Sequence, residues 1–211
     1  LFNVYFESFV NNNNVELRSI VSSLSPCLFF LTHVFSDMTV LGVFLKYLDC
    51  CGVKTCVVLY DNLIQMRDVL QLNHCEYLYQ EKSDFFSKLS EAIKEGRCSF
   101  ILPDVSYAIY YADRYRFSLS PLMSEKQLST GNVILDNMLH KDLFFRTEIL
   151  KLSDYFDMPI VPFSGAFDGS DLSIKFHKSV HCRGRLDNIS PSELMLELFE
   201  EKIDFFVKSC S

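Results

Sequence analysis

The feature that most constrains the fold of this chain is an alternation of short apolar runs with segments of helical periodicity. The apolar runs have the length of buried strands and are bounded by turn-forming residues; they lie at residues 27–31, 54–60, 98–102, 159–165 and 172–176. Helices are predicted at residues 16–24, 37–48, 62–72, 84–95, 133–139, 147–156 and 192–208. This alternation predicts an α/β fold with a mostly parallel central sheet and helices on both faces.

Length and composition predict a single domain over residues 1–211. The chain has no internal repeat and no long linker, and 49% of its residues are hydrophobic, so a chain of this length should bury roughly 70% of its unfolded surface. A net charge of −7 argues against a nucleic-acid partner, because phosphate contacts favour basic faces. No apolar stretch approaches the roughly 20 residues of a membrane-spanning helix, which leaves peripheral membrane contact open.

The eight cysteines indicate a reducing compartment. They are scattered, form no CxxC pair, and several stand within apolar runs. Such cysteines are typical of buried, reduced thiols. We therefore expect a cytoplasmic protein.

Polar residues at the carboxyl ends of the predicted strands are the candidates for a functional site, because parallel sheets gather functional groups at that edge. By position these residues are His33, Asp37, Tyr60, Asp61, Asp104 and Ser164. His33 leaves a buried strand, and Asp37 follows at a helix start. A carboxylate that accepts from one imidazole nitrogen leaves the other free to act as a general base. The alternative is that Asp37 only caps the helix.

The order of motifs along residues 27–176 resembles the lysophospholipid-acyltransferase superfamily, and within it the late acyltransferases of lipid A biosynthesis. The matching segments are Thr32-His33 with Asp37 and Gly42, residues 57–60 followed by Arg67, residues 92–104 ending in Asp104, and residues 157–163. The segment 92–104 (AIKEGRCSFILPD) is the most similar of these. The resemblance implies a lysophospholipid-acyltransferase-like fold.

The resemblance also implies an enzyme that transfers a fatty acyl group from an acyl carrier protein or CoA thioester to a hydroxyl or amine. His33 would act as general base, Asp37 would orient it, Arg67 would hold donor phosphate, and Asp104 would lie at the site. No cofactor or metal is implied. Three residues separate His33 from Asp37, one fewer than is usual in the family, and Met38 stands at the usual acid position. A second hypothesis is therefore a degenerate subunit that binds acyl chains or a partner protein without turnover.

Two further features lie near residue 180. His177 and His181 are four residues apart and Cys182 follows, a pattern that binds zinc on a helix, although this stretch is predicted as strand and loop. Four basic residues surround them: Lys175, Lys178, Arg183 and Arg185. This basic patch is either a docking surface for an acidic carrier protein or a solvated loop.

Overall fold

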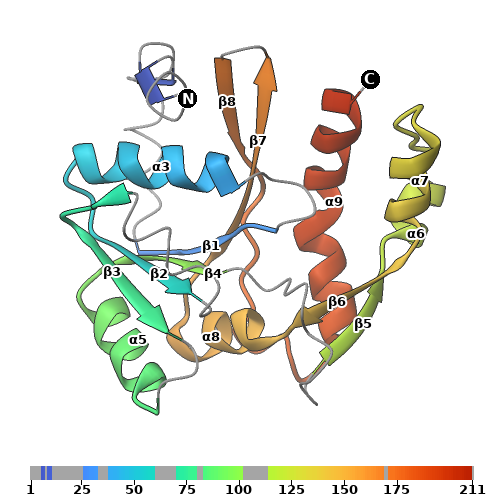
Figure 1. Cartoon of the computed structure of the whole chain (residues 1–211). Coiled ribbons are helices and arrows are strands. Elements are labelled where there is room, and N and C mark those ends of the chain that lie inside the picture. Colours follow the sequence, from blue (N-terminus) through green and yellow to red (C-terminus); the bar gives the residue numbers. More distant parts are fainter. Residues whose placement is uncertain are drawn as a thin grey trace.

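The computed structural model describes residues 6–7, 9–10, 26–32, 38–59, 70–79, 83–101, 114–168 and 171–210. Their main feature is a six-stranded sheet of order β3-β2-β4-β1-β7-β8. The strands are β1 (Leu28–Phe30), β2 (Thr55–Leu59), β3 (Cys75–Tyr79), β4 (Cys98–Ile101), β7 (Ile160–Asp168) and β8 (Asp171–Phe176). The first five pair in parallel, and β8 pairs antiparallel with β7. The predicted α/β class with a mostly parallel sheet is therefore confirmed (Figure 1).

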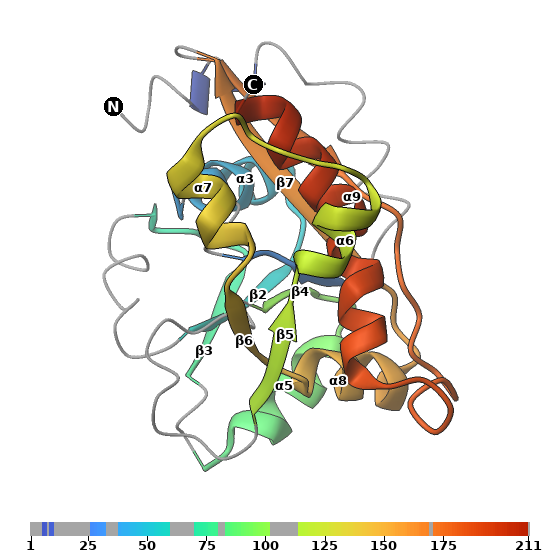
Figure 2. The same ribbon diagram turned by 90° about the vertical axis from the view of Figure 1, so that its right-hand side faces the viewer.

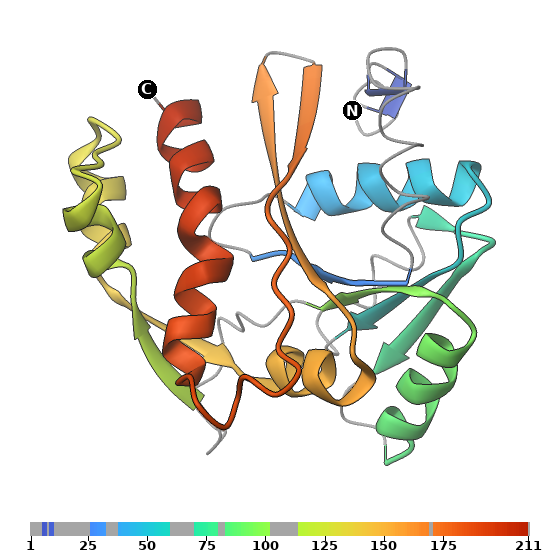
Figure 3. The same ribbon diagram turned by 180° about the vertical axis from the view of Figure 1, so that it is seen from behind.

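Helices cover both faces of this sheet (Figures 1 and 3). One face packs against α3 (Met38–Cys50), and the other packs against α5 (Phe85–Lys94), α8 (Glu148–Phe156) and α9 (Pro191–Cys210). Strand β1 lies between β4 and β7 and is fully buried, which explains its unbroken apolar sequence. Its side chains alternate, with Phe29 in the α3 core and Leu28 and Phe30 in the α9 core.

The α3 core is built around aromatic rings. Phe44 of α3 has ring centroids of four other phenylalanines within 6 Å: Phe29 at 5.6 Å, Phe100 at 5.8 Å, Phe163 at 5.3 Å and Phe176 at 5.5 Å. Edge-to-face and tilted pairs at such spacing add to the stabilisation from apolar burial. Part of the unusual phenylalanine content of the chain is therefore core packing between α3 and four strands.

Two parts of the structure differ from the sequence prediction. Strand β3 was not predicted, because it lies at the sheet edge and buries only Leu78 fully, so its sequence lacks a continuous apolar run. An antiparallel pair, β5 (Arg114–Ser118) with β6 (Asp142–Arg146), lies outside the main sheet. Neither of these two strands was among the predicted ones.

The β5–β6 pair is accompanied by two short helices, α6 (Ser120–Glu125) and α7 (Val133–Leu139). Helix α9 contacts both α6 and β5 (Figure 2). Of these elements only α7 was predicted, with the bounds that the structure has. The predicted helix at 16–24 lies outside the described residues, and only 70–72 of the predicted helix at 62–72 are described.

The described cysteine side chains are free thiols, and Cys27, Cys56, Cys98 and Cys182 are buried. Burial raises the pKa of the Cys56 thiol, which keeps it protonated at neutral pH. Among the helices that the structure describes, none combines the length and the apolar character needed to cross a membrane.

Candidate functional site

The carboxyl ends of three neighbouring strands define the edge where a site was predicted. In register, Phe30 of β1 pairs with Ile101 of β4 on one side and with Pro162 of β7 on the other. The chain therefore leaves β1 between the end of β4 and the continuing strand β7. The four residues predicted for the site, His33, Asp37, Arg67 and Asp104, lie outside the described residues, as do Tyr60 and Asp61.

Ser164 is the described member of the predicted strand-end set. The predicted strand-end position is wrong: β7 continues to Asp168 because it pairs with β8, so Ser164 lies within the strand, two residues beyond Pro162, and is 1% exposed. Its hydroxyl oxygen is 3.0 Å from Nε2 of His177. His177 follows the end of β8, and its backbone N–H donates to the carbonyl of Pro162 at 2.8 Å. The β7–β8 pairing therefore positions the imidazole against the Ser164 side chain.

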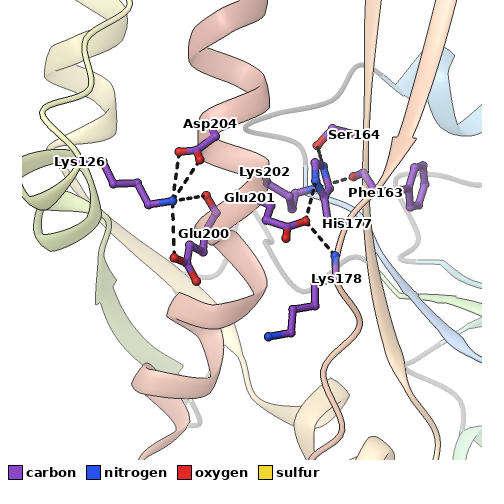
Figure 4. Close-up of polar contacts among 9 residues, drawn as sticks. All are labelled: Lys126, Phe163, Ser164, His177, Lys178, Glu200, Glu201, Lys202 and Asp204. Atoms are coloured by element: carbon purple, nitrogen blue, oxygen red, sulfur yellow. Dashed lines mark hydrogen bonds and ion pairs between the residues drawn. The ribbon is translucent and has the colours of Figure 1, made fainter.

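Helix α9 contributes a carboxylate and an ammonium group to the same place. Oε2 of Glu201 is 3.6 Å from Nδ1 of His177 and accepts a hydrogen bond from the backbone N–H of Lys178 at 2.9 Å. Lys202 is fully buried, and its Nζ donates to the carbonyl of Phe163. We call Ser164, His177, Glu201 and Lys202 the His177 cluster; Figure 4 shows these side chains converging from β7, the end of β8, and α9.

The buried ammonium of Lys202 is compensated by groups that can face a positive charge. Besides the Phe163 carbonyl, the ring of Phe30 lies below it, with Nζ 5.6 Å from the ring centroid. A buried cation is costly unless polar groups or a π face replace its hydration. Lys202 thus brings a fixed positive charge to the backbone beside Ser164.

His177 is neutral at physiological pH. Burial is the largest cause and the Lys202 ammonium the second; together, and against the opposing effect of Glu201, they lower the pKa of His177 from 6.5 to about 4. A neutral imidazole carries one N–H, and a carboxylate can only accept, so we assign the hydrogen to Nδ1, facing Glu201. Nε2 is then the acceptor, and the Ser164 hydroxyl donates to it.

A further polar group lies close to the end of β1. Thr32 is two residues beyond Phe30 and fully buried, and its hydroxyl has no hydrogen-bond partner among the described residues. A buried hydroxyl without a partner is uncommon. The Thr32 hydroxyl therefore places a polar group shortly after β1, one residue before His33 in the sequence.

Sequence reasoning found Ser164 but did not connect it with its partners. His177 was considered as a zinc ligand with His181 and Cys182; within the described residues, no three His, Cys, Asp or Glu side chains are arranged to hold a metal. Glu201 and Lys202 lie in a helix that was predicted only as amphipathic. One signal was present, because Lys202 continues the i, i+4 spacing of the buried residues Leu194 and Leu198.

The basic patch is partly neutralised within the chain. Arg183 pairs with Asp157, and Arg185 pairs with Glu197 through both terminal guanidinium nitrogens. These pairs join the loop after β8 to α8 and α9. Two of the four basic residues predicted as a docking surface therefore already have acidic partners.

Comparison with known proteins adds no family assignment at this point. No protein-family model matches the chain, and no curated protein matches it either.

Proposed function

We propose that this protein is an acyltransferase that moves an acyl group from a carrier-protein or CoA thioester to a hydroxyl or amine acceptor. The observation that supports it is the sheet order: β1 lies between β4 and β7. The segments that begin with His33 and Asp104 follow β1 and β4 in the sequence, and both strands end at the same edge. A lysophospholipid-acyltransferase-like fold, which the motif order resembles, would use its groups at this edge.

In the proposed reaction His33 takes the proton from the acceptor hydroxyl or amine while that atom attacks the thioester carbonyl. Asp37 accepts from the other imidazole nitrogen and fixes the tautomer. Arg67 binds donor phosphate, a task suited to a guanidinium group. Backbone N–H groups stabilise the oxyanion. Collapse of the tetrahedral intermediate breaks the C–S bond, and the leaving sulfur takes the proton from His33 and departs as the thiol. Asp104 helps to position the acceptor.

The test is thiol release from acyl-CoA and from acyl-carrier-protein donors, with the product followed by mass spectrometry. We expect His33→Ala to lower the rate by roughly 10²–10⁴-fold, the usual contribution of a general base. His181→Ala is the matched control, because His181 is exposed and lies in the loop after β8, and it should keep the wild-type rate. Equal rates for His33→Ala and wild type would refute this mechanism.

The short His33–Asp37 spacing allows a sharper test of the orienting acid. If Asp37 is the acid that orients His33, Asp37→Asn should slow thiol release. The double variant Asp37→Asn/Met38→Asp should then be as slow as Asp37→Asn alone. Rescue by Met38→Asp would mean that the usual family spacing is required. Acyl-chain or carrier-protein binding without thiol release from any donor would instead favour the degenerate binding subunit.

A further inference from the structure

We propose that Ser164 is a nucleophile that can be acylated by thioesters or activated esters, with His177 as its base and Glu201 as the group that orients His177. The inference takes only its substrate class from the proposed acyl transfer, and it does not require His33. It assigns the His177 cluster to a covalent acyl-enzyme step, which direct attack assisted by His33 would not contain.

The geometry carries this assignment. A nucleophilic serine requires a hydroxyl within hydrogen-bond reach of a histidine nitrogen, and a carboxylate facing the other nitrogen. Here the two contacts are 3.0 Å from Ser164 Oγ to His177 Nε2 and 3.6 Å from His177 Nδ1 to Glu201 Oε2. The first is a hydrogen bond. The second is longer than a hydrogen bond, and Nδ1 of His177 is buried with no hydrogen-bond partner among the described residues, so Glu201 is the nearby carboxylate that a side-chain movement would bring to it. The three residues come from β7, the end of β8, and α9, so tertiary packing alone brings them together.

Lys202 supplies the electrostatic part of the arrangement. It donates to the carbonyl of Phe163, the peptide group that is bonded to the Ser164 nitrogen. A fixed positive charge at this point favours negative charge developing on the serine oxygen. The neutral state of His177 at physiological pH leaves Nε2 able to accept the serine proton.

The step balances without a further reagent. Ser164 Oγ attacks the acyl carbonyl while its proton passes to His177 Nε2. The C–S bond, or the C–O bond of an ester, then breaks, and the leaving group takes the proton from His177. An O-acyl serine remains. Water or an acceptor hydroxyl, deprotonated by His177, attacks the acyl-serine, and the Ser164 oxygen departs with that proton.

The burial of the cluster decides the choice of probe. Ser164 is 1% exposed and the His177 residue 6% exposed, so an acyl donor reaches Ser164 only when the packing around the cluster opens locally. We therefore expect acyl donors of small cross-section to react faster than bulky ones. An ethyl fluorophosphonate, which modifies activated serines, and p-nitrophenyl acetate meet that requirement.

The experiment treats the folded chain with each probe and locates the adduct by peptide mass mapping. We expect a single modified serine, Ser164, with adduct formation lost in Ser164→Ala and slowed by roughly 10²-fold or more in His177→Gln. Ser153 is the internal control: it is equally buried, at 1% exposure, but its hydroxyl donates to the Met158 carbonyl at 2.7 Å instead of to a histidine. It should stay unmodified in the same sample.

Two results would overturn the inference: absence of an adduct on Ser164 in wild-type protein that unfolds cooperatively, or equal modification of Ser153. Because both are measured on the wild type, a variant that fails to fold does not affect them. Thiol release that depends on His33 but not on Ser164 would leave the proposed acyltransferase in place and remove only the acyl-enzyme. Modification of Ser164 that persists in His33→Ala would support the inference independently.

Discussion

The two faces of the central sheet differ in chemistry, and consecutive residues of β7 show the difference. Phe163 points into the aromatic core beneath α3, where its ring centroid lies 5.3 Å from that of Phe44. Ser164 points the opposite way, towards His177 and α9. On the α3 face, burial removes apolar area from water and stabilises the fold directly. On the α9 face, burial includes an imidazole and an ammonium group, which reduce stability unless every polar contact is kept.

The α3 face therefore mainly stabilises the fold, whereas the α9 face holds the reactive groups. Substitutions in the α3 core should change the free energy of unfolding and leave the reactivity of Ser164 unaffected. Substitutions in the His177 cluster should change reactivity and the pH dependence of stability together.

The largest effect is expected for Phe44→Ala, which removes the ring that contacts four other phenylalanines in the α3 core. We expect a loss of about 3–5 kcal/mol in the free energy of unfolding, measured by urea denaturation. Phe86→Ala is the matched control, because Phe86 is 65% exposed and its removal should cost far less. Similar losses for the two variants would contradict the central role of the Phe44 contacts.

The His177 cluster should make stability depend on pH. In the unfolded chain His177 takes up a proton near pH 6.5, and in the fold only near pH 4. Between these values the unfolded state binds more protons, so the free energy of unfolding should fall as the pH drops from about 6.5 to about 4, by about 3 kcal/mol.

His177→Gln isolates this contribution, since all other titrating groups are shared with the wild type. The variant should have a flatter pH dependence over the same interval in denaturant titrations. If the two pH profiles are parallel, His177 is protonated alike in both states and the cluster is not a buried neutral imidazole.

The close approach of α3 to β7 gives a third test. A Cβ at Gly165 would lie 2.4 Å from Cγ1 of Val40. Gly165→Ala gains roughly 0.4–1 kcal/mol through the unfolded state, but overpacking costs roughly 1–3 kcal/mol, so we expect a net loss. Adding Val40→Ala creates space for the new methyl group. A double-mutant cycle by thermal unfolding should therefore give a favourable coupling energy, whereas strict additivity would disprove the clash.

The smallest effect is expected on the outer side of α9. Nζ of Lys126 lies 3.1 Å from a carboxylate oxygen of Asp204 and 3.6 Å from one of Glu200. Figure 4 shows the Lys126 side chain facing these two acids of α9. These acids are partly exposed, so Lys126→Met should cost under about 1 kcal/mol. The difference from wild type should shrink further at high salt in denaturant titrations. A loss as large as that of Phe44→Ala would show that this ion-pair group anchors α9.

Much of the fold was predictable from the local hydrophobic pattern, because that pattern is clear in the central strands and in the helices that cover them. β1 and β4 are fully buried, β7 begins with the buried run 160–163, and α5 and α8 have helical spacing of apolar residues. The edge strand β3 and the β5–β6 pair were not predictable, because an edge strand needs no apolar run and a two-stranded pair outside the sheet depends on its neighbour α9. The site was predictable only as positions at strand ends, and four of its predicted residues lie outside the described part of the chain.

The sequence by itself determined the α/β class and the burial of the central strands, because these follow from hydrophobic periodicity along short segments. Tertiary structure alone decided that Ser164, His177, Glu201 and Lys202 meet. Their separations in the chain are 13 residues from Ser164 to His177 and 39 from Phe163 to Lys202, and no local pattern spans such intervals. The strand register and the packing of α9 across the sheet bring these groups into contact.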